Sequence, residues 1–148
     1  MRFMILRRSD DRTESGLLPP QEMISAMGKY KAALQQAGVF VSGDGLLPTT
    51  RGARVHYQDG QVSVTDGPFA ETKELVAGFL IVDVESLEEA VKWATMCPSL
   101  CGHGEAVMEV RQVAQLSDFP AGMEEQLAQM PWDTLSGQAS AKQPGSSV

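Results

Sequence analysis

The feature that most constrains the fold is an uninterrupted apolar segment at residues 75–82, together with a shorter one at residues 3–6. Side chains alternate between the two faces of a strand, so a strand that is apolar at every position needs both faces covered. The longer segment is far below the roughly 18 residues that predict a membrane-spanning helix. We therefore expect two strands buried inside a globular protein that does not associate with a membrane.

Composition narrows the class of protein. The chain has 148 residues, 12 basic and 19 acidic side chains, a formal net charge of −7 and 43% hydrophobic residues. This length and hydrophobic content predict a globular chain built around one main domain. The negative charge argues against nucleic acid as a partner, because phosphate contacts need a basic surface. Residues 3–6 are too short for the apolar core of a signal peptide, so we expect a cytoplasmic location.

Two segments have the spacing of an amphipathic helix. In the first, which begins near residue 20, apolar residues recur every three or four positions and Gly38 follows as a C-terminal cap. This periodic set is Met23, Met27, Tyr30, Leu34 and Ala37. The second helix begins at Ser86, which forms a capping box with Glu89, and ends before Pro98. Its predicted buried stripe is Leu87, Ala90, Val91 and Ala94.

The clearest local signal is a β-hairpin centred on Asp59-Gly60. This dipeptide is typical of a two-residue turn that needs positive φ at both positions. Residues on either side alternate between apolar and polar, so one face of the hairpin is apolar and the other polar. We expect Tyr57 to pair with Val62 and Val55 with Val64. The polar face then carries Arg54, His56, Ser63 and Thr65.

The order of the expected elements predicts an α+β fold. Strands at residues 2–8, 39–41, 75–84 and 106–113 alternate with the two helices and the hairpin, whereas residues 9–16 and 43–45 are expected to form turns. This order is that of a ferredoxin-like βαββαβ unit with an inserted β-hairpin. Two helices cover only one face of the sheet. The apolar second face therefore predicts a homodimer in which sheet packs against sheet.

The C-terminal part of the chain has a different composition. We expect the domain to span residues 1–116 and a C-terminal extension to span residues 117–148. Helical spacing predicts a short helix at residues 121–130, and the remainder is rich in Ser, Gly, Gln and Ala, which is typical of disorder.

Residues 64–74 read Val-Thr-Asp-Gly-Pro-Phe-Ala-Glu-Thr-Lys-Glu, which resembles the signature of the DGPF proteins, a subgroup of the YCII-related family. Residues 43–46, 51–55 and 109–111 agree with it, so that the resemblance covers roughly residues 1–116. It implies a dimeric α+β barrel, in which two ferredoxin-like units pack face to face. For relatives of this family, it implies a suggested enzyme role that depends on a His–Asp pair. It also implies an association with extracytoplasmic-function sigma factors in bacteria. Neither His56 nor His103 lies in the signature.

The signature loop supplies the candidate site residues. Asp66 and Lys73 are the candidate catalytic residues, because a carboxylate can handle a proton while an ammonium group binds an anion. The candidate ligand-binding residues are Arg54, His56, Gly67, Pro68, Phe69 and Glu71. A purely structural role is the alternative, since Asp, Gly and Pro are typical turn residues and exposed charges are usually solvated.

The sequence predicts neither a metal site nor an organic cofactor. Cys97, Cys101 and His103 form at most half of a zinc site, because zinc sites usually combine two separated pairs of ligands. Reduced thiols near a helix end are the alternative interpretation. The sequence also contains no phosphate-binding glycine loop and no nucleophile elbow.

Two functions therefore stay open. The first is a small-molecule-binding homodimer, including a cofactor-independent enzyme that uses acid–base chemistry near residues 66–74. The second is a non-catalytic sensor or accessory protein linked to sigma-factor-type transcriptional regulation. In that case the segment from Met123 to Trp132 would be its docking element.

Overall fold

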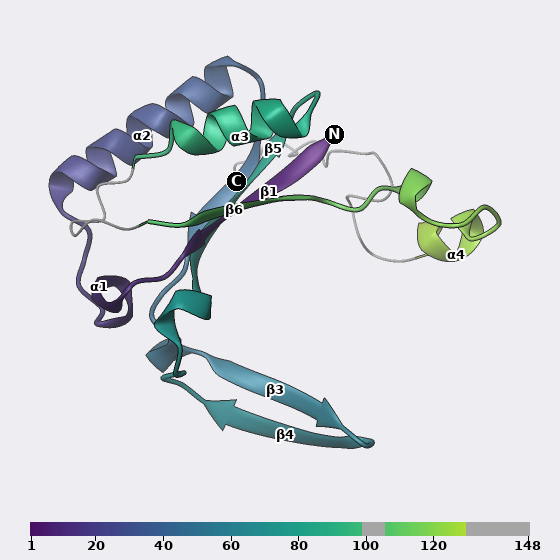
Figure 1. The fold of residues 1–148 in the computed structure, drawn as a ribbon, viewed down its shortest axis with the longest axis horizontal. Helices are drawn as coiled ribbons and strands as arrows, with labels where there is room; N and C mark the ends of the chain where they lie inside the picture. Colours follow the sequence, from purple (N-terminus) through teal and green to yellow (C-terminus); the bar gives the residue numbers. More distant parts are fainter. Residues whose placement is uncertain (99–105, 130–148) are drawn as a thin grey trace, which may run out of the picture. The chain divides into compact units, whose positions relative to one another are not determined.

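The computed structural model describes residues 1–98 and 106–129 (Figure 1). The chain divides into two compact units, Met1–Gln112 and Val113–Val148. The second unit contains the short helices η3 (Leu116–Asp118) and α4 (Glu124–Ala128). Cys101, His103, Trp132 and the predicted disordered tail lie outside the described residues.

The first unit is built on a four-stranded sheet in the order β2-β5-β1-β6. Its strands are β1 (Arg2–Arg8), β2 (Phe40–Gly45), β5 (Val76–Asp83) and β6 (Met108–Gln112). Every neighbouring pair is antiparallel. The inserted hairpin of β3 (Ala53–Gln58) and β4 (Gln61–Asp66) forms a separate two-stranded sheet. The predicted α+β, ferredoxin-like fold is therefore confirmed, whereas the dimeric barrel needs a second chain and stays a prediction.

The two longer helices, α2 (Gln21–Gln36) and α3 (Leu87–Thr95), cover the same face of this sheet (Figure 1). The core lies between them and the sheet, and Phe3, Leu34 and Val82 are its largest fully buried side chains. Burying one such side chain contributes about 1.5–3 kcal/mol. Strand alternation places Phe3 and Ile5 in this core, as the sequence predicts for a sheet covered by helices.

The opposite face of the sheet is also apolar. The register pairs Met4 with Ile81 and Leu6 with Phe79, and these four residues point away from the side that holds Phe3 and Ile5. We call them the second sheet face. Because α2 and α3 both pack on the Phe3 side, the second sheet face takes no part in the core that these helices form.

Local signals are largely confirmed. Asp59 and Gly60 have φ of 51° and 77°, and the hairpin has the predicted register, including Tyr57 opposite Val62. The backbone N–H of Glu89 donates to Ser86 Oγ at 3.1 Å, which forms the predicted cap of α3. Gly38, with φ of 72°, directly follows Ala37, the residue that caps the C-terminal end of α2.

Two expectations based on local pattern are wrong in part. Residues 9–16 contain a short helix, α1 (Asp11–Glu14), because the Asp10 carboxylate accepts the Thr13 N–H and caps it. Strand β2 continues through residues 43–45, where a turn was expected. A Cβ at Gly43 would lie 2.9 Å from the Phe79 carbonyl oxygen, so glycine allows this close pairing with β5.

The helix faces are also narrower than predicted. Ala90 and Ala94 of α3 are buried, but Leu87 and Val91 are 53% and 42% exposed. In α2, Met27 is 37% exposed, and Ala37, which caps the helix, is exposed, whereas the other predicted members of its stripe are buried. Small side chains on α3 pack closely on the sheet, which leaves its flanking residues at the surface.

Candidate functional site

The predicted catalytic residues both lie at the surface. Asp66 is the last residue of β4 and pairs with Ala53, and Lys73 lies in η2 (Thr72–Glu74). Glu71, with φ of 61°, immediately precedes η2 and is exposed. His56 lies on the exposed polar face of β3. The described contacts do not join Asp66 to Lys73.

Other signature residues hold the base of the hairpin in place. A Cβ at Gly67 would lie 1.7 Å from the Thr49 carbonyl oxygen, so no other residue fits there without displacing backbone. The Phe69 N–H donates to Thr49 Oγ1 at 3.2 Å. The Arg54 guanidinium lies 4.1 Å from the centre of the Phe69 ring, which is a cation–π contact. The structure therefore brings Gly67 and Phe69 to Thr49 and Arg54 to the Phe69 ring, with Pro68 joined to Gly67 by a cis peptide bond.

Glu14 completes this arrangement. Its Oε2 atom accepts hydrogen bonds from Thr49 N at 3.1 Å and from Thr49 Oγ1 at 2.6 Å. Its Oε1 atom accepts from Ser9 Oγ at 3.0 Å. Burial raises the pKa of Glu14, but the hydrogen bonds from Thr49 and Ser9 outweigh it, so the pKa lies below its ordinary value. Sequence patterns do not point to Glu14, because its partner is remote in the chain.

A cavity of about 450 Å³ lies between α2 and the sheet. We call it the α2 cavity. Its walls come from α2, β1, β2 and β5, with one residue from β6 and two residues, Cys97 and Pro98, from the segment after α3. Apolar side chains form most of its lining, including Met23, Met27, Leu34, Phe40 and Leu80. Such a lining suits the hydrocarbon part of a small molecule.

One polar side chain in this lining is firmly held. The Tyr30 hydroxyl donates to the Trp93 carbonyl oxygen at 2.8 Å. Burial, followed by the neighbouring Cys97, raises the pKa of Tyr30 above its ordinary value. Tyr30 therefore remains neutral at physiological pH and acts as a structural hydrogen-bond donor between α2 and α3.

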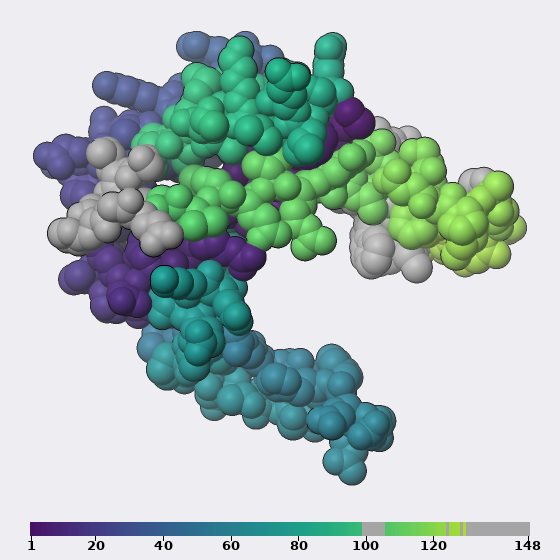
Figure 2. All heavy atoms as spheres, in the orientation of Figure 1, coloured from purple at the N-terminus to yellow at the C-terminus, as the bar shows by residue number. Residues whose placement is uncertain are grey.

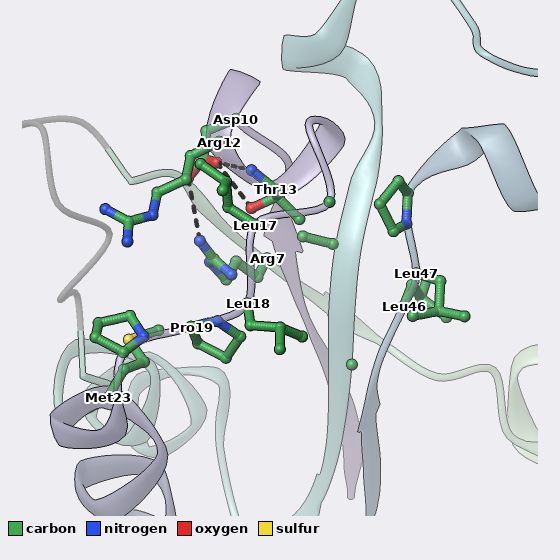
Figure 3. A pocket seen from close by; sticks show the side chains of 15 residues that line it. Arg7, Asp10, Arg12, Thr13, Leu17, Leu18, Pro19, Met23, Leu46 and Leu47 are labelled. Atoms are coloured by element: carbon green, nitrogen blue, oxygen red, sulfur yellow. Dashed lines mark hydrogen bonds and ion pairs between the residues drawn. The ribbon is translucent and has the colours of Figure 1, made fainter.

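A second cavity of about 350 Å³ lies beside α1 (Figure 3). We call it the arginine cavity, because Arg7 and Arg12 are part of its lining. Apolar residues from the segment before α2 and from the segment after β2 form its other walls. These are Leu17, Leu18, Pro19, Pro20, Leu46, Leu47 and Pro48. The two cavities adjoin, since Arg7, Pro19, Met23, Gly45 and Ala77 line both.

Asp10 organises the polar wall of the arginine cavity. Arg7 Nη2 donates to Asp10 Oδ2 at 3.2 Å, and Thr13 donates to Asp10 Oδ1 from both its N–H and its hydroxyl at 2.7 Å (Figure 3). Burial raises the pKa of Asp10, but these hydrogen bonds and the charges of Arg7 and Arg12 outweigh it and lower the pKa. Asp10 is therefore ionised at neutral pH.

None of the residues that the sequence predicts for the site lines either cavity. Within residues 1–98 and 106–129, no group of three or more His, Cys, Asp or Glu side chains is placed to hold a metal ion. In the same part of the chain, no helix has the length and apolar character needed to cross a membrane. The two cavities, which are partly open to solvent, therefore lie apart from the residues of the signature loop.

Comparison with known proteins finds a matching family, a relative in sequence and a similar solved structure. The YCII-related domain family matches residues 1–117. An uncharacterised protein of Rhizobium meliloti is 49% identical over 49 residues; the match spans 33% of this chain and only 40% of that relative. Among solved structures, the 5-chloro-2-hydroxyhydroquinone dehydrochlorinase TftG from Burkholderia phenoliruptrix AC1100, in complex with 2,5-dihydroxybenzoquinone, matches with a TM-score of 0.44 and 18% identity. This match covers 80% of the present chain and 98% of TftG.

Proposed function

We propose that this chain, which belongs to the YCII-related family, is a small-molecule-binding protein whose ligand occupies the α2 cavity. The observation that carries the proposal is the volume of about 450 Å³ combined with a mostly apolar lining. Small-molecule sites typically have volumes of about 300–1,000 Å³ and apolar walls with a few polar groups. Lys31 and Arg7 supply such groups here, whereas the Tyr30 hydroxyl already donates to the Trp93 carbonyl oxygen.

A homodimer is the second part of the proposal. The apolar face of the hairpin is exposed, with Tyr57 at 80% and Val64 at 63% relative exposure, and the hairpin stands out from the body of the first unit (Figure 2). A two-stranded hairpin is at best marginally stable alone in water. The second sheet face offers a further apolar surface on the same chain. A second copy would cover both kinds of surface and give the isologous contact of a two-fold dimer.

Acid–base catalysis near residues 66–74 stays a prediction. Asp66 and Lys73 are exposed and lie outside both cavities of the single chain. A carboxylate does useful acid–base work only where burial or neighbours adjust its pKa. A catalytic site built on these residues would therefore need the second copy to enclose it. The accessory function linked to sigma factors rests on the family resemblance alone.

The ligand site is tested with the neutral fluorophore N-phenyl-1-naphthylamine. Gly28 lines the α2 cavity, and a Cβ added there meets nothing within 4 Å, so Gly28→Leu places an isobutyl group beside the cavity without a clash at Cβ. We expect Gly28→Leu to weaken binding of the fluorophore about tenfold, which corresponds to about 1.4 kcal/mol.

The matched control is Ala32→Leu, which adds a leucine to an exposed position of α2 that lines neither cavity. It should bind the fluorophore like the unmodified chain. Equal losses in both variants, or no binding to the unmodified chain, would contradict the proposed site.

A further inference from the structure

We infer that the ligand is an amphiphilic anion, whose apolar body lies in the α2 cavity and whose anionic group lies in the arginine cavity beside Arg12. The inference rests on the proposed function and adds the chemical class of the ligand. It joins two observations: the two cavities adjoin, and their linings differ in charge.

The two spaces border on one another at shared residues. Arg7, Pro19, Met23, Gly45 and Ala77 belong to the lining of both cavities. A molecule that occupies both cavities would lie against Met23 and Arg7, which line both of them. A ligand that occupies both is longer than one that fills the α2 cavity alone, and its two ends meet different surroundings.

The charges of the arginine cavity favour an anion. Its lining contains two arginines and one aspartate, a net charge of +1, although the whole chain carries −7. The Asp10 carboxylate already accepts hydrogen bonds from Thr13 and Arg7. A cationic ligand would have to compete with these partners for the carboxylate, whereas an anion would meet a site of opposite net charge.

Arg12 is the group best placed to receive that anion. It is exposed, and its guanidinium, whose charge acts on Asp10, is not among the hydrogen-bond donors of the described part of the chain. A guanidinium presents several N–H donors in a planar fork, which suits carboxylate, sulfonate and phosphate groups. A bare inorganic anion fits the cavity less well, because it has no apolar surface to bury against Leu17, Leu18 and Leu46.

The test uses two fluorophores that share one apolar body. 8-Anilino-1-naphthalenesulfonate carries a sulfonate group, whereas N-phenyl-1-naphthylamine does not. Fluorescence titration of the full chain gives the affinity for each. We expect Arg12→Gln to weaken binding of the sulfonate about tenfold and to change binding of the neutral compound less than about twofold, because a hydrogen bond to a charged group contributes about that much.

Two further variants sharpen the result. Arg51→Gln removes an exposed arginine from η1 (Thr49–Arg51), which lines neither cavity, and should leave both affinities unchanged. Arg12→Lys keeps the charge and should recover part of the lost sulfonate affinity. Far-UV circular dichroism of each variant confirms that the fold is retained.

The outcomes separate this inference from the proposed function. If Arg12→Gln affects both fluorophores equally, or no more than Arg51→Gln does, the anion site is refuted while the α2 cavity can still bind neutral molecules. If the neutral fluorophore fails to bind, or ignores Gly28→Leu, the proposed function itself fails.

Discussion

Thr49 donates two hydrogen bonds to one carboxylate oxygen of Glu14, from its backbone N at 3.1 Å and from its Oγ1 at 2.6 Å, across 35 positions of sequence. The same hydroxyl oxygen accepts the Phe69 N–H at 3.2 Å, and the Thr49 carbonyl lies against Gly67. One network thus connects α1, η1 and the signature loop. This network holds the base of the hairpin to the rest of the first unit.

Removing the Thr49 hydroxyl should weaken this network. Thr49→Val keeps the backbone N–H but deletes both the donor to Glu14 and the acceptor for Phe69, and a hydrogen bond to a charged group contributes about 1.5–3 kcal/mol. We expect a loss of about 1–2 kcal/mol in the free energy of unfolding, since the site is only half-buried, measured by urea denaturation. Thr49→Ser retains the hydroxyl and should lose far less; equal losses would count against the network.

Stability should fall in acid because Glu14 has a lowered pKa. The unfolded chain binds a proton at Glu14 at a higher pH than the folded chain does, so the ionised carboxylate favours the folded state. The contribution is fully present above about pH 4.5 and is lost as the pH falls through the lower folded pKa. Glu14→Gln should flatten the decline of the free energy of unfolding below pH 4.5. An unchanged decline would show that other carboxylates cause it.

Gly67 and Gly28 should respond to alanine in opposite directions. A Cβ at Gly67 would lie 1.7 Å from the Thr49 carbonyl oxygen, so Gly67→Ala forces backbone apart and should cost about 3 kcal/mol. A Cβ at Gly28 meets nothing within 4 Å in the middle of α2, so Gly28→Ala should stabilise the fold by about 0.5–1 kcal/mol. Thermal unfolding measures both; a stable Gly67→Ala variant would disprove the close approach.

The proposed dimer depends on the apolar face of the hairpin. We expect the unmodified chain to scatter light as a species of about 32 kDa, twice the 16.0 kDa of one chain. Tyr57→Lys places a charge in the proposed contact and should shift the protein towards the monomer. Ser63→Lys adds the same charge to the polar face of the hairpin and should not. If light scattering gives the unmodified chain a mass of 16.0 kDa at micromolar concentration, the dimer is ruled out.

Local features were predictable because their causes lie within a few residues. The Asp59-Gly60 turn sets the register of its own hairpin, and Ser86 caps the helix that follows it. The order of strands and helices was predictable for the same reason, and with it the α+β fold. The two wrong predictions of local structure also have local causes. The helix that Asp10 caps is too short to show a periodic pattern. Gly43 is of a residue type common in turns, although here it pairs closely with β5.

The candidate site divides differently. The signature of residues 64–74 identifies the family, but its roles for Gly67 and Phe69 appear only where they meet Thr49. By itself the sequence determined the elements, their order and the need to cover two apolar faces of one sheet. Only the tertiary structure decided where the cavities lie and that Arg7, Asp10 and Arg12 share one of them. Cavities arise where segments far apart in the chain pack together, as residues 7–13 and 45–48 do here, and a local sequence pattern does not show which segments will meet.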